Sequence, residues 1–137
     1  MNTDAHWMKE ALALAAQAGT ICEVPVGAVV VREDQIVGRG FNRREVDRDP
    51  LAHAELLAIR EAAHTLDRWR LTGCTLYVTL EPCPMCLGAM VNARVDRLVF
   101  GAKETKARPN HFVQIDSGVL AQEASNLLSD FFKRLRF

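Results

Sequence analysis

The first forty residues combine one helical repeat of apolar side chains with two shorter runs that are typical of strands. A polar turn around Glu33 and Asp34 joins the runs at 26–31 and 36–41, so we expect a β-hairpin there. Before the hairpin, Gly19 marks the end of a helix. The apolar positions that predict this helix by their spacing are Trp7, Met8, Ala11, Leu12, Ala15 and Ala18.

Helical and strand-like segments alternate after the hairpin. A polar loop at 43–50 leads into a stretch rich in Ala, Leu and Glu, which predicts a helix that begins near His53. β-branched and aromatic residues predict strands at 74–80, 97–102 and 111–116.

Two further helices complete the predicted order. Cys83 stands where an N-cap would be, and Pro84 suits the first position of a helix because its missing N–H would have no partner there. The whole order predicts an α/β fold in one domain over residues 1–137, with a mixed five-stranded sheet between helices on both faces. The apolar face of the terminal helix consists of Ala124, Leu127, Leu128, Phe131, Phe132 and Leu135.

Composition adds constraints on partners and location. Hydrophobic residues make up 49% and charged residues 25%, which is typical of a globular protein, and no apolar stretch approaches the length of a membrane span. We therefore expect a cytoplasmic protein with no membrane partner. The 17 basic and 17 acidic residues balance, although residues 94–137 carry 8 basic against 5 acidic side chains. A polyanionic partner would favour that third of the chain, but ordinary solvated surface is the better explanation of so small an excess.

The four cysteines are too few for a disulfide scaffold in a chain of this length. Cys83 and Cys86 form a C-x-x-C motif directly after a predicted strand. The motif alone is compatible with a redox pair, with half of a structural zinc site, or with two ligands of a catalytic metal. Cys22 and Cys74 are expected to be small buried apolar residues.

His53 and Glu55 stand at the start of the second predicted helix, and they bear on the three interpretations of the C-x-x-C motif. Helix N-termini at one edge of a sheet can converge, which makes His53, Cys83 and Cys86 a plausible set of three zinc ligands. No fourth ligand has matching spacing, so the site would be open to water, as catalytic zinc sites are. Glu55 could then act as general base, although an acidic residue at a helix N-terminus is also explained by the helix dipole.

The sequence resembles a known family at these residues and beyond them. "HAE" and "PCPMC" match the H-x-E…P-C-x-x-C signature of zinc-dependent deaminases. The wider likeness is to bacterial tRNA-specific adenosine deaminases, within the cytidine and deoxycytidylate deaminase superfamily, and it implies the three-layer α/β/α fold of cytidine deaminases. The segments that carry it are "EVPVGAVVV", "GFN", "DPLAHAELLAIREA", "WRLTGCTLYVTLEPCPMCLGAM", "RLVFGA" and "LLSDFFKRLR".

The resemblance implies roles for individual residues. Zinc would be bound by His53, Cys83 and Cys86, with Glu55 as the proton shuttle. The target base would be bound by Asn42 and by an apolar wall at Val24, together with Ala54 and Glu104. The implied reaction is the zinc-dependent hydrolysis of adenosine to inosine at wobble position 34 of a tRNA anticodon stem-loop. Family members are homodimers, and the apolar faces of the helices at 53 and 84 would be candidates for that interface.

The chain departs from the family after residue 104. Family members usually continue with a Gly-rich segment of a dozen or more residues before an Asn-His pair, whereas here "KETKARP" leads directly to Asn110 and His111. Glu104 stands where the family has an Asp that holds the RNA. The residues that could still contact RNA phosphates are Lys103, Lys106, Arg108, Lys133, Arg134 and Arg136, the last three of which are equally explained as a basic helix C-terminus.

The shortened segment keeps other functions open. One alternative is a deaminase of a free nucleobase or nucleoside, such as guanine or cytosine, or of another RNA. Another is a zinc or thiol module without catalytic activity, in which Glu55 would be dispensable.

Overall fold

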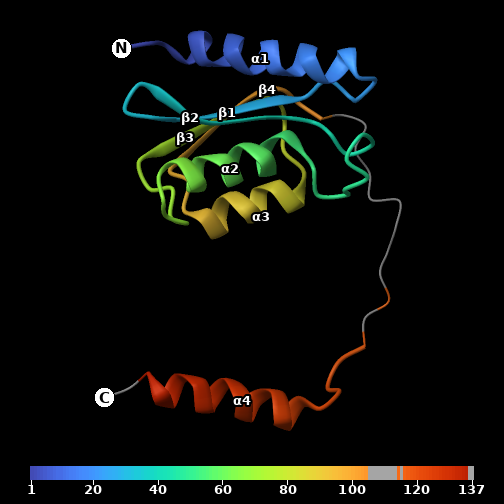
Figure 1. Cartoon of the computed structure of the whole chain (residues 1–137), viewed down its shortest axis with the longest axis vertical. Coiled ribbons are helices and arrows are strands. Elements are labelled where there is room, and N and C mark those ends of the chain that lie inside the picture. The colour runs from blue at the N-terminus through green and yellow to red at the C-terminus, as the bar shows by residue number, and fades with distance from the viewer. Residues whose placement is uncertain (105–113, 115, 136–137) are drawn as a thin grey trace. The chain divides into compact units, whose positions relative to one another are not determined.

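The chain divides into two compact units, residues 1–107 and 108–137, in a computed structural model that describes residues 1–104, 114 and 116–135. The first unit holds a sheet with its helices, and the second holds the terminal helix (Figure 1). The expectation of a single domain over the whole chain stays a prediction. None of the described helices is both long enough and apolar enough to cross a membrane.

The sheet of the first unit is mixed, as predicted. Its strands are β1 (Gly27–Arg32), β2 (Gln35–Phe41), β3 (Cys74–Leu80) and β4 (Arg97–Ala102), in the spatial order β2-β1-β3-β4. β1 runs antiparallel to β2 and β3, and β3 runs parallel to β4. The described residues therefore show four strands of the five expected, and most of the segment predicted as the fifth, 111–116, lies outside them.

Helices cover both faces of this sheet, which gives the predicted three layers. α1 (Asp4–Thr20) packs on one face, and α2 (Ala54–Thr65) and α3 (Pro84–Ala93) lie next to each other on the other face (Figure 1). Alternate residues of the strands serve the two layers: Val29 belongs to the cluster beneath α1, and Val30 to the cluster beneath α2 and α3. Both side chains are fully buried.

The hairpin and the first helix follow the sequence pattern with one correction. Glu33 and Asp34 have φ angles of 51° and 61°, the left-handed conformation that two-residue hairpin turns require. In α1, Trp7 and Ala11 are buried as expected, but Leu12 is 53% exposed. Leu14 is buried instead. Each residue turns a helix by about 100°, so Leu12, which directly follows the buried Ala11, points away from the stripe that faces the sheet.

Two glycines let α2 lie unusually close to β2. A Cβ on Gly40 would collide with the backbone of Ala54 and Ala58, and one on Gly38 with the backbone of Ala58 and Ala62. The small alanine side chains of α2 therefore fit against the two glycines of β2, which have no side chains. Gly40 faces the first turn of α2, so it sets the height at which that turn stands above the sheet.

A polar cluster ties the start of α1 to the sheet. The Asp4 carboxylate accepts hydrogen bonds from the Tyr77 hydroxyl (2.7 Å) and from the Arg97 guanidinium (2.8 and 2.9 Å). These donors lower the pKa of Asp4 to about 2. Burial and the neighbouring carboxylate raise the pKa of Tyr77 to about 12. The cluster joins three elements, α1, β3 and β4.

The second unit contains α4 (Ala121–Arg134), which confirms the terminal helix. None of its residues is buried. Lys133 and Arg134 stand in its last turn, where positive charge is favoured by the helix dipole.

Candidate active site

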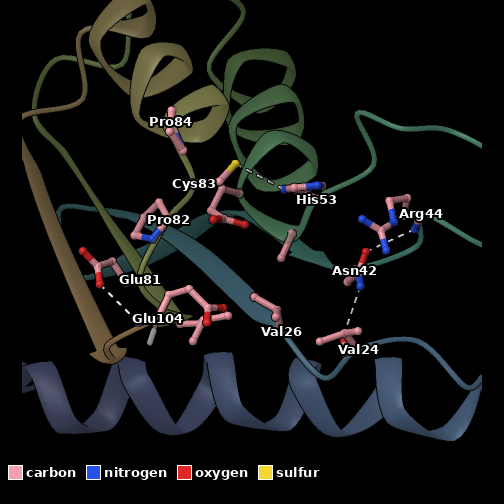
Figure 2. A pocket seen from close by; sticks show the side chains of 13 residues that line it. Val24, Val26, Asn42, Arg44, His53, Glu81, Pro82, Cys83, Pro84 and Glu104 are labelled. Atoms are coloured by element: carbon pink, nitrogen blue, oxygen red, sulfur yellow. Dashed lines mark hydrogen bonds between the residues drawn. The ribbon is translucent and has the colours of Figure 1, made fainter. Parts of the chain in front are cut away.

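The N-termini of α2 and α3 meet at one edge of the first unit and bring the predicted ligands together (Figure 2). His53 is the N-cap of α2 and Cys83 the N-cap of α3, and both have extended backbones. Neither side chain caps its own helix, so both project toward the space between the helices. Cys86 follows in the first turn of α3 and is completely buried.

The three ligand atoms form a nearly equilateral triangle. Cys83 Sγ lies 3.7 Å from Cys86 Sγ, and His53 Nδ1 lies 3.7 Å from Cys83 Sγ and 3.6 Å from Cys86 Sγ. Tetrahedral zinc holds sulfur at about 2.3 Å and nitrogen at about 2.0–2.1 Å, which separates its ligand atoms by about 3.6–3.8 Å. The observed triangle therefore has the size that zinc requires.

The electrostatics of this cluster also favour a bound cation. Burial, together with the negative charges of Glu55 and Cys83, raises the pKa of the Cys86 thiol well above its usual range. A metal ion would remove this cost, because a coordinated thiol is deprotonated outright. Among the described residues, His53, Cys83 and Cys86 are the one group of three or more such side chains close enough to share an ion. The donor set and its spacing thus fit one zinc ion with a position left open.

Glu55 stands beside this cluster in the first turn of α2. Its side chain is almost fully buried, and burial raises its pKa, while hydrogen bonds from its own backbone N–H and from the Cys86 thiol act in the opposite direction. A raised pKa makes a buried carboxylate more ready to take up a proton, as a general base must. This environment goes beyond what the helix dipole alone would explain.

A pocket of about 440 Å³ opens in front of these groups (Figure 2). Its floor carries His53, Glu55 and Cys83, and its walls are partly apolar. All four residues expected to bind the base line it. The full lining consists of Val24, Val26, Asn42, Arg44, His53, Ala54, Glu55, Leu80, Glu81, Pro82, Cys83, Pro84 and Glu104.

Asn42 holds two loops together at one side of the pocket. Its Nδ2 donates to the Val24 carbonyl (3.2 Å), and its Oδ1 accepts from the Arg44 backbone N–H (3.1 Å). Its own backbone N–H donates to the Val26 carbonyl (3.0 Å). The Val24 side chain is 58% exposed, so it offers an apolar surface to a ligand.

Glu81 and Glu104 form the opposite side of the pocket (Figure 2). The Glu104 backbone N–H donates to Glu81 Oε1 (3.1 Å), and the Glu81 backbone N–H donates to the Ala102 carbonyl (2.8 Å). These bonds hold the end of β4 against the end of β3. Sequence reasoning missed both Glu81 and Arg44 as lining residues. The sequence offered two signals: Glu81 directly precedes Pro82-Cys83, and Arg44 follows Asn42 by two positions.

The residues expected to contact RNA are only partly described. Lys103 is exposed at the end of β4, close in sequence to Glu104. Lys133 and Arg134 lie in the second unit. Lys106, Arg108 and Arg136 fall outside the described residues, so their expected role stays a prediction.

The other two cysteines differ from each other. Cys74 is fully buried, as predicted, and burial raises its pKa. The prediction for Cys22 was wrong: it is exposed, with a φ of 62°, because it lies in the turn that leaves α1 and not in an element that packs on the sheet.

Comparison with known proteins agrees with this geometry. Residues 1–102 match the cytidine and deoxycytidylate deaminase zinc-binding region. The tRNA-specific adenosine deaminase of Bacillus subtilis (strain 168) is 46% identical, with 99% of this chain and 92% of that protein covered. The alignment spans 149 positions although this chain has 137 residues, so at least 12 positions have no counterpart here. This agrees with a shortened segment.

The solved structures that are similar to the chain include two deaminases with different substrates. One, from a study of A-to-I editing by tRNA:A34 deaminases at the wobble position, is 40% identical with a TM-score of 0.72 and covers 82% of this chain and 95% of that one. The guanine deaminase of Bacillus subtilis is 30% identical with a TM-score of 0.82 and covers 94% of this chain and 93% of that one. The two neighbours share a fold and differ in substrate.

Proposed function

The chain belongs to the cytidine and deoxycytidylate deaminase family, and we propose that it hydrolyses adenosine to inosine at wobble position 34 of tRNA. The observation that carries the chemistry is the triangle of His53, Cys83 and Cys86 at a pocket that His53, Cys83 and the buried Glu55 line. The relation to tRNA-specific deaminases, at 46% identity over nearly the whole chain, supports the choice of substrate.

His53, Cys83 and Cys86 would hold the zinc ion through one imidazole nitrogen and two thiolates. His53 faces both sulfurs with Nδ1, so as a ligand it carries its proton on Nε2. Bound zinc supplies a water of lowered pKa as the nucleophile. The two helix N-termini favour the negative charge of the thiolates.

Glu55 moves the protons of the reaction. Its carboxylate takes one proton from the attacking water and delivers it to N1 of the adenine ring. It then carries the second water proton from the new C6 hydroxyl to the leaving amine, so one group acts alternately as base and as acid. The water oxygen becomes O6 of inosine, the bond from C6 to the amine nitrogen breaks, and ammonia leaves. The raised pKa of Glu55 suits a group that must hold the proton between these two transfers.

The rest of the pocket orients the base. Asn42 presents its side-chain amide, and Val24 offers an apolar surface against which a purine ring can rest. Ala54 and Glu104 line the same space. A target nucleotide would have to leave the base stack of the anticodon loop to reach it, and in a single-stranded loop this costs little.

The test is a comparison of substrates. The purified zinc-loaded protein is incubated with an anticodon stem-loop that carries adenosine at the wobble position and, separately, with free adenosine, guanine and cytosine. We expect inosine in the stem-loop and at most slow turnover of the free compounds. Turnover of a free base with no inosine in the stem-loop would refute the proposed substrate.

Deamination of free guanine is the second candidate. It is favoured by the guanine deaminase structure, whose TM-score of 0.82 exceeds the 0.72 of the tRNA deaminase structure and which covers more of this chain. The shortened segment after residue 104 points in the same direction, because it removes surface that could hold RNA. The substrate comparison described above separates the two candidates directly.

We further propose that the protein acts as a homodimer in the cytoplasm, where tRNA is available. Leu87 and Val91 on the outer side of α3 are 43% and 73% exposed, and Gly88 between them has open space around its α-carbon. This small apolar surface would allow a second copy to approach closely. Sedimentation at micromolar concentration tests the dimer, and a monomer there would count against it.

A further inference from the structure

Arg44 lines the pocket, and its side chain takes no part in the proposed chemistry. It follows Asn42 by two positions, and among the described residues that line the pocket it is the only arginine or lysine. Figure 2 shows it next to Asn42, on the side of the pocket away from Glu81 and Glu104. A positive charge therefore stands at the side where the base-binding amide lies.

The backbone of Arg44 is fixed while its side chain is not. Its N–H donates to Asn42 Oδ1 (3.1 Å), and its carbonyl accepts from the Asp49 N–H (3.1 Å). The guanidinium makes no hydrogen bond to any described residue, and its only ion pair is a long contact of 3.9 Å with Glu45. Both side chains of that pair are largely exposed, at 53% and 75%, so the pair contributes little.

The neighbouring Arg43 shows what a structural arginine looks like in this loop. Its guanidinium donates three hydrogen bonds to Asp47 at 3.0–3.1 Å and stands 5.5 Å from the ring centre of Phe41. Asp47 also raises the pKa of Arg43. The hydrogen-bond donors of Arg43 therefore stabilise the loop, whereas the donors of Arg44 remain available beside the pocket.

We propose that Arg44 binds the backbone phosphate next to the target nucleotide and thereby favours polynucleotides over free bases and nucleosides. A guanidinium matches a phosphate with two parallel N–H donors, and such charge-assisted bonds are the strong ones. A free base or nucleoside has no phosphate, so it gains nothing from this residue. The inference rests on the proposed function, because it assumes a nucleic-acid substrate.

The charges around the pocket make this contact selective. Glu55 and Glu81 also line the pocket, and a carboxylate there repels a phosphate. A strand that enters the pocket would therefore run its phosphates along the side of Asn42 and Arg44. The Asn42–Arg44 hydrogen bond then couples the group that orients the base to the residue that holds the adjacent phosphate.

The experiment measures binding without turnover. A labelled anticodon stem-loop with inosine at the wobble position, which has no amine left to remove, is titrated with zinc-loaded protein at several salt concentrations between about 50 and 200 mM. The variants are Arg44→Gln, Arg44→Lys and the matched control Arg48→Gln. Arg48 is an exposed arginine of the same loop that does not line the pocket. Zinc content and melting temperature establish that each variant is folded.

We expect Arg44→Gln to weaken binding about tenfold and to reduce the slope of log K against log salt by about one, as the loss of one phosphate contact does. Arg44→Lys should restore most of the slope, and Arg48→Gln should resemble the unmodified protein. Equal affinities and slopes for Arg44→Gln and Arg48→Gln would overturn the proposal. A loss of affinity with an unchanged slope would also overturn it, because it would mean that Arg44 only positions Asn42.

Failure of this inference can be told apart from failure of the proposed function. The proposed function fails if the unmodified protein forms no inosine in the adenosine stem-loop. The role of Arg44 fails if the protein deaminates the stem-loop and Arg44→Gln binds and deaminates it as well as Arg48→Gln does.

Discussion

The floor and the rim of the pocket are built in different ways. The metal corner, which consists of His53, Glu55, Cys83 and Cys86, lies on the first turns of two helices that pack on the sheet. The rim, which consists of Val24, Asn42, Arg44 and Glu104, lies on loops. Glu55 and Cys86 are buried, whereas Val24 and Arg44 are exposed.

This contrast indicates where each property of the protein resides. The tRNA deaminase and guanine deaminase structures share this fold, although their substrates differ greatly in size. Helix N-termini seated on a sheet can hold reacting groups to within fractions of an ångström, and loops can change without disturbing them. We infer that the metal corner sets the reaction and that the rim selects the substrate.

The largest effect is expected from Glu55→Ala, which removes the proton shuttle and leaves the three ligands. Deamination should fall by at least roughly 10²- to 10⁴-fold, because general acid–base catalysis contributes that much. Zinc content should stay at one ion per chain, and binding of the inosine stem-loop should stay unchanged, since the rim is intact. Ammonia release, metal analysis and anisotropy measure the three quantities. An active Glu55→Ala protein would refute the mechanism.

Cys86→Ser should remove the metal and destabilise the fold together. A zinc ligand contributes folding free energy, so the variant should have a lower melting temperature and should no longer respond to a chelator, which destabilises the unmodified protein. Cys22→Ser is the matched control, because Cys22 is exposed and belongs to neither region. If the chelator lowers the melting temperature of Cys86→Ser as much as that of the unmodified protein, Cys86 is not a ligand.

Gly40→Ala should disturb the metal corner by displacing the first turn of α2. The added Cβ collides with the backbone of Ala54 and Ala58, so α2 must shift, at a cost of about 1–3 kcal/mol in the free energy of unfolding. Because Ala54 lies between His53 and Glu55, zinc affinity and deamination should fall as well. In Gly38→Ala the added Cβ collides with α2 one turn further from His53. This variant should lower stability with a smaller effect on zinc affinity. Equal losses of zinc affinity in both variants would contradict this.

The smallest effect is expected from Asp4→Asn, which lies in neither region. Hydrogen bonds from Arg97 and Tyr77 lower the folded-state pKa of Asp4 to about 2, below its unfolded value near 3.8. The charged carboxylate therefore stabilises the fold above about pH 4, and this contribution is lost as the pH falls toward 2. Asp4→Asn should be slightly less stable at pH 7, and the difference should vanish in acid. Urea unfolding at several pH values measures it, while zinc content and activity at pH 7 should not change.

Local patterns in the sequence predicted most of the elements. The bounds of β3 and β4 agree with the predicted 74–80 and 97–102, and the hairpin turn falls at Glu33 and Asp34. These features depend on alternation, helix capping and turn chemistry among near neighbours, which the sequence displays directly. The apolar face of α1 was less well predicted, because which side of a helix is buried depends on what it packs against: Leu14 packs with Val29 of the sheet, whereas Leu12 is exposed.

The sequence by itself determined which residues carry the chemistry: H-x-E and P-C-x-x-C contain the ligands and the base, and side-chain identity decides what a zinc ion can bind. Only the tertiary structure decided how they meet. The 3.6–3.7 Å triangle joins residues 30 and 33 positions apart, and it requires two helices to be seated on one sheet. The tertiary structure also decided how two adjacent arginines differ. Arg43 and Arg44 are equivalent as letters, and they differ because the folded loop places Asp47 against one and the pocket beside the other.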